Sequence, residues 1–208
     1  AAAMGARLPV TDAGGSIVVD IGGGTTEIAV ISLGGIVVSR SMRLAGDKLD
    51  EDIIQFARNE LNLVIGERMA EKVKIEIGSA HPETEKLESV MRGRDVVTGL
   101  PKAVKVTTLQ VRKAIQNSIN SIIDTIKLTL EETPPELVAD ILERGITLTG
   151  GGALTRGLDR LVSEECKMPA YVAEDPLSCV VRGTGIVIED LAALQEVLVT
   201  SRYAKKLR

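Results

Sequence analysis

The residues from Asp20 to Thr26 have the composition of a phosphate-binding turn. Asp20 ends a short apolar run, the three glycines Gly22, Gly23 and Gly24 follow, and the hydroxyl residues Thr25 and Thr26 come next. Glycine amides can approach an anion closely because no Cβ atom blocks the way. The threonine hydroxyls add donors, and a carboxylate can hold a hydrated Mg²⁺ against phosphates. The stretch therefore predicts a nucleotide phosphate site.

The surroundings of this turn separate it from two other glycine-rich loops. A Walker A loop has the pattern G-x-x-x-x-G-K-[ST] and a Rossmann loop has G-x-G-x-x-G, and both open a helix. Here the chain re-enters a strand-like run at residues 28–31. The pattern favours a β-hairpin with a phosphate at its tip, and a plain glycine-rich hairpin turn is the alternative.

A second glycine turn follows the strand-like residues 146–148. It consists of Gly150, Gly151, Gly152, Ala153 and Leu154 and is expected to lead into a helix from about residue 156. Such a junction aims amides and the positive end of a helix dipole at an anion. By itself it is equally typical of a simple entry into a helix. Together with the first turn, it favours a second contact with the same nucleotide.

Glu71 and Lys74 form a third, weaker candidate. Residues at i and i+3 share one face of a helix, so a carboxylate for sugar hydroxyls and a cation beside the base would lie together. Glutamate and lysine at this spacing are most often a solvated surface pair. Gly46 and Asp47 are a further weak candidate for the ribose, with helix capping as their ordinary role.

The composition excludes several classes of protein. The 208 residues are 44% hydrophobic and only 1% aromatic, which predicts an aliphatic core and argues against platforms that stack single-stranded nucleic acid. A net charge of −4 argues against a general binder of polyanions. His81 is the one histidine and is expected in an exposed loop, while Cys166 and Cys179 are expected as free thiols of a reducing cytoplasm. No apolar run has the length of a membrane span.

The order of elements predicts an α/β fold, a mixed sheet with flanking helices and a small inserted α+β subdomain. Expected strands are 16–21, 26–32, 36–42, 146–148 and 170–172, with a hairpin within 87–106. Expected helices are 48–65 with Asp47 as N-cap, 67–77, 109–130, one that begins with a capping box at 133–136 and ends near Gly145, 156–166, and one from Pro176. Residues 202–208 are expected to fray.

The motifs resemble one superfamily closely. VVDIGGGTTEIAVISLGG is similar to the second phosphate motif of actin, heat-shock chaperone ATPases and sugar kinases, and ITLTGGGALTRGLDRLV is similar to their adenosine motif. The linking text, including GERMAEKVKIEIGSA and AEDPLSCVVRGTG, resembles the bacterial actin homologues of the MreB family. The resemblance runs from about Leu8 to Glu189 and implies an actin-like, ribonuclease H-like fold.

The resemblance also implies a function. Such proteins are cytoplasmic ATPases that polymerise into membrane-associated filaments, work with cell-wall elongation proteins and maintain rod shape. It implies that Asp20 works with Mg²⁺ through water, and that the glycines 22–24 with Thr25 and Thr26 contact phosphate or position the attacking water. It further implies that Glu71, Lys74 and residues 150–154 hold the adenosine of ATP or ADP.

The chain departs from the family pattern at its start. The family's first domain carries a D-x-G-T loop and a water-orienting glutamate, and neither precedes Ala1. The resemblance is therefore to the second domain, with residues 1–46 and 111–208 as subdomain IIA and 47–110 as subdomain IIB. We expect this chain alone to hydrolyse ATP negligibly and not to bind membranes, which in the family is done by segments absent here. A small-molecule kinase of the superfamily and a non-hydrolysing interaction module are the alternatives.

Overall fold

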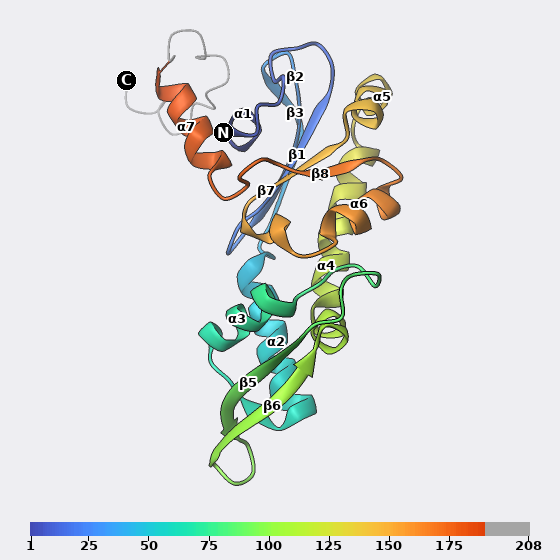
Figure 1. The fold of residues 1–208 in the computed structure, drawn as a ribbon. Coiled ribbons are helices and arrows are strands. Elements are labelled where there is room, and N and C mark those ends of the chain that lie inside the picture. Colours follow the sequence, from blue (N-terminus) through green and yellow to red (C-terminus); the bar gives the residue numbers. More distant parts are fainter. Residues whose placement is uncertain (190–208) are drawn as a thin grey trace, which may run out of the picture.

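Two β-sheets organise the computed structural model, which describes residues 1–189 (Figure 1). The large sheet has the strand order β3-β2-β1-β7-β8, and the small sheet has the order β4-β5-β6. The strands are β1 Ser16–Ile21, β2 Thr26–Ser32, β3 Gly35–Met42, β4 Leu63–Val64, β5 Glu88–Asp95, β6 Pro101–Thr107, β7 Ile146–Thr149 and β8 Ala170–Val172. The helices are α1 Ala2–Gly5, α2 Gly46–Leu61, α3 Glu67–Ile77, α4 Thr108–Glu131, α5 Pro135–Arg144, the 3₁₀ helix η1 Gly151–Leu154, α6 Leu158–Cys166 and α7 Cys179–Glu189.

The large sheet is mixed, as predicted. Strands β1, β2 and β3 form the expected antiparallel meander, and β1, β7 and β8 run parallel. The parallel register sets Asp20 at the end of β1 directly beside Thr149 at the end of β7. The glycine turns that follow these two strands are therefore neighbours at one edge of the sheet.

Alternation along β1 gives the large sheet two covered faces. Ile17, Val19 and Ile21 belong to the main core, which they share with the helices α4, α5 and α6. Val18 points to the other face, where a small cluster includes Ala3 of α1. Successive side chains of a strand point to opposite faces, so a run of apolar residues requires cover on both sides.

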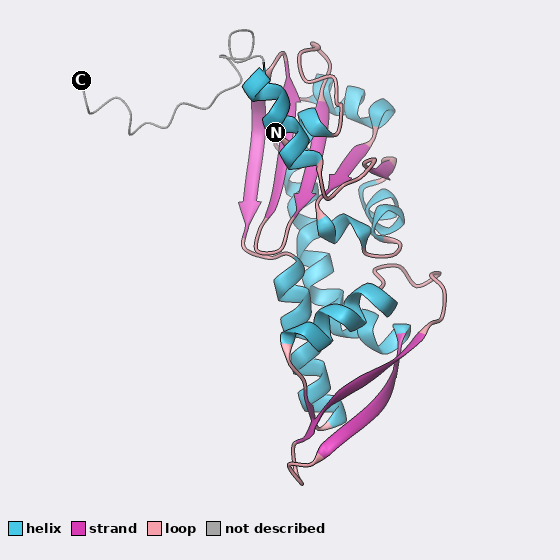
Figure 2. Ribbon diagram, turned by 60° about the vertical axis from the view of Figure 1, so that its left-hand side comes forward, coloured by secondary structure: helices cyan, strands magenta, loops and turns pink. Residues whose placement is uncertain are grey.

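Helix α4 connects the regions of the two sheets (Figures 1 and 2). It contacts α2 and β6 of the small-sheet region as well as β2 and α6 of the large-sheet region. Its apolar stripe is fully buried from its start until it reaches the partly buried Leu130, and the buried members are Val111, Ile115, Ile119, Ile122 and Ile126. A capping box begins the helix, because the Thr107 hydroxyl accepts from the Gln110 amide and the Gln110 side chain accepts from the Thr107 amide. The division into 1–46 with 111–208 and 47–110 stays a prediction, and its second boundary falls inside this helix.

The first helix of the small-sheet region differs from its predicted form. Helix α2 ends at Leu61, not at residue 65, because Asn62 adopts a left-handed conformation with φ of 50°. The next residues form β4, a short strand that pairs with β5 and that the sequence pattern did not predict. The prediction of Asp47 as N-cap was also wrong: Ala45 holds that position and Asp47 lies in the first turn.

The predicted capping box of α5 was wrong. Pro134 is the N-cap and cannot supply a side-chain acceptor. A proline does occupy the first helical position, but it is Pro135, one residue later than the capping box implies. The hydroxyl of Thr133 instead donates to the carbonyl of Thr129, 2.7 Å away in the last turn of α4. The side chain of Thr133 therefore bonds a carbonyl at the C-terminal end of α4 and does not cap α5.

The prediction of an exposed His81 was wrong as well. The residue lies in the loop between α3 and β5 but is only 3% exposed. Its Nε2 atom is 2.9 Å from Oε2 of Glu164 in α6, 83 positions further along the chain. A polar local sequence indicates that a loop is exposed on average. It does not indicate which side chain of the loop is buried.

The two cysteines are free thiols, as predicted. Cys166 is half-buried at the end of α6, and burial raises its pKa to about 11. The thiolate is the reactive form of cysteine, so this group is inert at neutral pH. Across residues 1–189, no helix combines the length and the apolarity needed to cross a bilayer.

Candidate functional site

The first glycine turn is attached to the start of α2. The Gly22 amide donates to the carbonyl of Thr25 at 2.9 Å and closes the turn. The Gly46 amide donates to Gly22 at 3.0 Å, and the Asp47 amide donates to Gly23 at 2.9 Å. Because these bonds use the carbonyls of the turn, they hold its backbone without occupying the Gly23 amide.

Asp20 has a partner that the sequence did not indicate. Its Oδ1 atom accepts a 3.0 Å hydrogen bond from the hydroxyl of Thr149, its neighbour across the parallel strands. Within the described residues, Oδ2 of Asp20 has no protein hydrogen bond. A fixed carboxylate with one free oxygen suits the water-mediated Mg²⁺ role that the sequence predicts.

The two threonines of the first turn differ in their surroundings. Thr26 is completely buried, and its hydroxyl donates to the carbonyl of Leu44 at 2.6 Å. Thr25 is exposed, and its carbonyl closes the turn. Thr26 thus ties the turn to the segment that leads into α2, and of the two hydroxyls only that of Thr25 is open to solvent.

The second glycine turn is packed against β1. Gly150 has a φ of 79°, and its amide donates to the carbonyl of Pro176 at 3.0 Å. The turn continues into η1, and α6 begins only at Leu158 with Gly157 as N-cap. The helix predicted from about residue 156 to 166 is present and starts two residues later than expected. Between Gly150 and that helix, Gly151 and Gly152 belong to the 3₁₀ turn, which the sequence did not predict.

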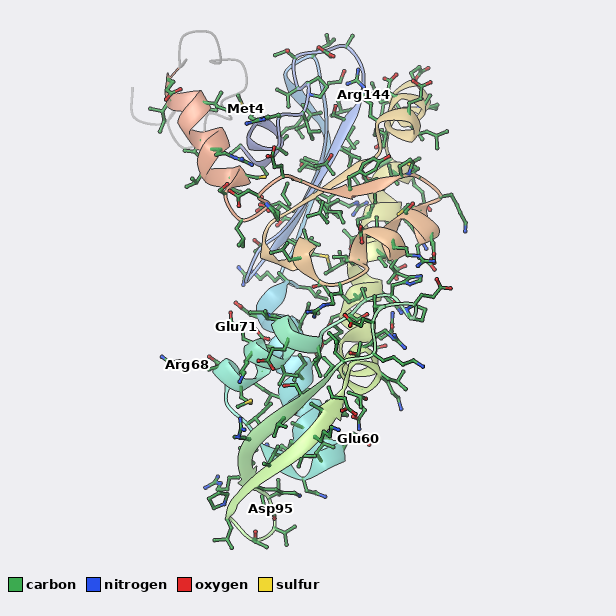
Figure 3. All side chains as sticks on the ribbon, in the orientation of Figure 1. Met4, Glu60, Arg68, Glu71, Asp95 and Arg144 are labelled. Atoms are coloured by element: carbon green, nitrogen blue, oxygen red, sulfur yellow. The ribbon has the colours of Figure 1, made fainter. Side chains whose placement is uncertain are left out.

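The side chain of Lys74, on α3, reaches the start of α2. Its Nζ atom donates to Oδ2 of Asp50 at 2.7 Å and to the carbonyl of Gly46 at 3.0 Å. Glu71, one turn earlier on α3, is exposed (Figure 3). Glu71 and Lys74 do share one face of α3, as predicted. The lysine is paired with a carboxylate of α2, whereas the carboxylate of Glu71 is exposed to solvent.

Asp50 is a buried acid that sequence reasoning missed. The residue is 9% exposed, and its Oδ1 atom is buried without a hydrogen-bond partner. Burial raises the pKa of the Asp50 carboxyl, against the lowering effect of Lys74. An unpaired buried acceptor is costly, so a ligand hydroxyl that reached this atom would gain a strong hydrogen bond.

These segments enclose one cavity of about 520 Å³. The predicted residues that line it come from all three segments and from the weaker ribose candidate: Gly22, Gly23, Gly46, Asp47, Glu71, Lys74, Gly151, Gly152 and Leu154. The other predicted residues do not line it: Asp20, Gly24, Thr25, Thr26, Gly150 and Ala153. The volume is within the range of sites for small organic ligands.

Part of the cavity wall was not predicted. Besides Asp50, it includes Gly78, Arg156 and the apolar side chains of Ile75 and Leu177. These two side chains, like that of the predicted Leu154, are more than half exposed. The exposed apolar groups suit the faces of a flat ring, whereas the glycine turns suit phosphate. Apolar residues of this kind carry no sequence signal, because they look like core residues until the fold is known.

A mixed sheet of this topology, with a glycine turn after β1 and a cavity between the turn, α2 and α3, defines an actin-like protein. The solved structure of MreB5 of Spiroplasma citri bound to ADP matches with a TM-score of 0.89 and 42% identity, over 94% of this chain and 59% of that one. The MamK filament determined by cryo-electron microscopy matches with a TM-score of 0.74 and 25% identity, over 95% and 60%.

The chain belongs to the MreB/Mbl protein family, whose model matches residues 1–196. It is 52% identical over 189 residues to the cell shape-determining protein MreB of Escherichia coli strain K12. That alignment covers 91% of this chain and 54% of the relative. The chain thus spans about half the length of the curated relatives that it matches.

Proposed function

We propose that this chain is the ATP-binding half of a filament-forming, actin-like protein of the bacterial cytoskeleton. The observation that carries the proposal is the single cavity at which three separately predicted segments meet. The phosphates would lie against the Gly22–Gly23 turn and the Gly151–Gly152 turn. The base would lie among the apolar side chains, and Glu71 would accept from the ribose hydroxyls.

A magnesium ion fits this arrangement. Asp20 stands at the end of β1, next to the first turn, and Thr149 fixes its carboxylate. Mg²⁺ is commonly held through one or two carboxylates, several waters and the phosphates of the nucleotide. When bound, the ion would neutralise phosphate charge beside the glycine amides, and Asp20 would hold it through water.

Self-association and cell-shape maintenance are supported by the relatives. MamK was solved as a filament, and the E. coli relative is named for determining cell shape. On this chain, the tip of the β5–β6 hairpin exposes Val97 and Leu100, which are 82% and 65% exposed. We propose that the whole protein forms cytoplasmic filaments at the membrane and organises cell-wall elongation proteins. The same relatives favour this function over that of a small-molecule kinase.

Isothermal titration of the chain with ADP and Mg²⁺ tests the proposal. We expect saturable binding that weakens about tenfold in Glu71→Ala, which is about the worth of one hydrogen bond to a charged group. Glu67→Ala is the matched control, because it removes the same charge from the same helix outside the cavity. No binding by the unaltered chain, or equal loss in both variants, would contradict the proposed site.

A further inference from the structure

A group of polar contacts joins the loop after α3 to helix α6. The buried imidazole of His81 is at its centre. Nδ1 accepts from the amide of Glu83 at 3.2 Å, so the proton of the neutral ring is on Nε2. Nε2 then donates to Oε2 of Glu164 at 2.9 Å. That bond holds the pKa of the Glu164 carboxyl below its ordinary value, because it favours the ionised form.

The backbone of the same loop is attached to two further elements. The Ala80 amide donates to the carbonyl of Arg156 at 2.9 Å, just before α6. The guanidinium of Arg112, from α4, donates to the carbonyl of His81 at 3.2 Å. The loop is thus bonded both to α4 and to the segment before α6, although in sequence it belongs to the small-sheet region.

This attachment lies directly behind the cavity. Gly78, at the end of α3, and Arg156 both line the cavity. The guanidinium of Arg156 also donates to the carbonyl of Ile75 at 3.0 Å. The contacts therefore connect the wall formed by α3 to the wall formed by η1 and the segment before α6.

The packing leaves little freedom at this junction. Gly157 has a φ of 72°, and a Cβ atom added to it would lie 2.7 Å from Cβ of His81. The loop and the start of α6 are therefore in direct contact. A shift of His81 toward α6 would press on the segment that carries Arg156.

We propose that His81 and Glu164 form a latch that sets the spacing of the two cavity walls and thereby the affinity for nucleotide. This inference rests on the proposed nucleotide site. Both are positioning residues, because neither lines the cavity. When only part of the population has the binding-competent spacing, the apparent dissociation constant rises in inverse proportion to that part. The latch keeps the competent fraction high.

The charged groups around the latch are few. Glu83 and Arg112 face it from the loop and from α4, and Arg160 of α6 pairs with both Glu83 and Glu164. Arg160 does not replace the latch when Glu164 is lost, because its remaining pair with Glu83 lies on the solvent side, where both side chains are more than half exposed. Salt bridges of this kind are weak.

Glu164→Ala and Glu165→Ala form a matched pair for the test. The two side chains are neighbours on α6, and they are 50% and 49% exposed. Glu165 pairs with Lys127 and does not touch the loop. We expect Glu164→Ala to raise the dissociation constant for ADP about fivefold, because a smaller fraction of the molecules would have the binding-competent wall spacing. We expect Glu165→Ala to change the dissociation constant less than twofold.

Two further measurements separate positioning from general stability. Glu164→Gln retains an acceptor for Nε2 of His81, so we expect it to restore most of the ADP affinity. Hydrogen exchange of the Ala80 amide, followed without nucleotide, is expected to accelerate in Glu164→Ala and to stay unchanged in Glu165→Ala.

The outcomes distinguish this inference from the function on which it rests. Faster exchange at Ala80 with unchanged ADP affinity would make the contacts structural only and overturn the latch. Unchanged exchange would also overturn it, because the bond would not hold the loop. If the unaltered chain bound no ADP, the proposed function would fail, and the latch would fail with it.

Discussion

The two glycine turns of this molecule look alike in sequence but differ in why they need glycine. At the second turn, a Cβ atom on Gly150 would lie 2.3 Å from the carbonyl oxygen of Ile21, and one on Gly152 would lie 2.2 Å from the Ile21 side chain. At the first turn, a Cβ atom on Gly23 would meet only the end of the Asp47 side chain at 3.3 Å. The second turn needs glycine at positions 150 and 152 for the fold itself, whereas the first has room that the fold leaves open.

This difference has a functional meaning. Positions at which the folded chain alone excludes a side chain are explained by packing. Gly22, Gly23 and Gly24 are not explained in that way, since no backbone atom comes within 3.0 Å of an added Cβ atom at any of them. A ligand that approaches the backbone at the first turn would explain why glycine is present at these three positions.

The largest expected effect is that of Gly150→Ala on stability. The methyl group would overlap a backbone carbonyl, and the positive φ adds strain, so we expect a loss of about 3 kcal/mol in the free energy of unfolding. Urea denaturation measures it. Gly151→Ala is the control, because its Cβ atom would meet only the Leu177 side chain at 3.3 Å. Equal losses in the two variants would break the comparison.

Gly23→Ala is expected to separate stability from binding. We expect its free energy of unfolding to change by less than about 1 kcal/mol, because the Asp47 side chain can move aside. ADP binding, measured by titration calorimetry, should weaken at least about tenfold, because the methyl group blocks the approach of phosphate to the amides. Gly185→Ala, at a position with open space in α7, is the control for the substitution. Normal ADP binding by Gly23→Ala would count against a phosphate at this turn.

The smallest expected effect is on the stability of a third turn, at the tip of the β5–β6 hairpin. In this turn the backbone amides bind a carboxylate of the chain itself. Oδ1 of Asp95 accepts from the amides of Val97 and Thr98 at 2.9 Å each. The bond from Thr98, followed by that from Lys102, lowers the pKa of the Asp95 carboxyl. A lowered pKa in the folded state means that the carboxylate stabilises the turn above its ordinary value of 3.8 and that this stabilisation is lost as the pH falls below it.

Hydrogen exchange at the Val97 and Thr98 amides checks this expectation. Protection of both amides, corrected for the intrinsic effect of pH on exchange, should be constant at neutral pH and should fall in strong acid. Asp95→Asn should show reduced protection already at neutral pH and little further change in acid. An acid-sensitive Asp95→Asn variant would show that another group controls the hairpin tip.

Much of the fold could be predicted from local patterns. The bounds of β1 and β2 were correct because apolar alternation and the flanking glycines act over a few residues. The helix predicted at 109–130 was equally clear, because its apolar residues recur at helical spacing, and α4 spans Thr108–Glu131. Strand β4 was missed because two residues carry no periodicity, and their conformation depends on pairing with β5.

The candidate site could be predicted only in part. The two glycine turns have compositions that point to phosphate, whereas Glu71 and Lys74 required the resemblance to a family. Asp50 is one of several acids at the start of α2, and nothing local indicates that it is the buried one. His81 was misjudged because its partner Glu164 is distant in the chain and becomes a neighbour only in the folded state.

Helix α4 has a consequence for how the molecule unfolds. At 1.5 Å per residue, its 24 residues extend about 36 Å, and its buried stripe contributes to the packing around both sheets. Unfolding of α4 would remove packing from the cores of both sheet regions. We therefore expect the two regions to melt together as one cooperative unit and the amides at the centre of α4 to be the last to exchange.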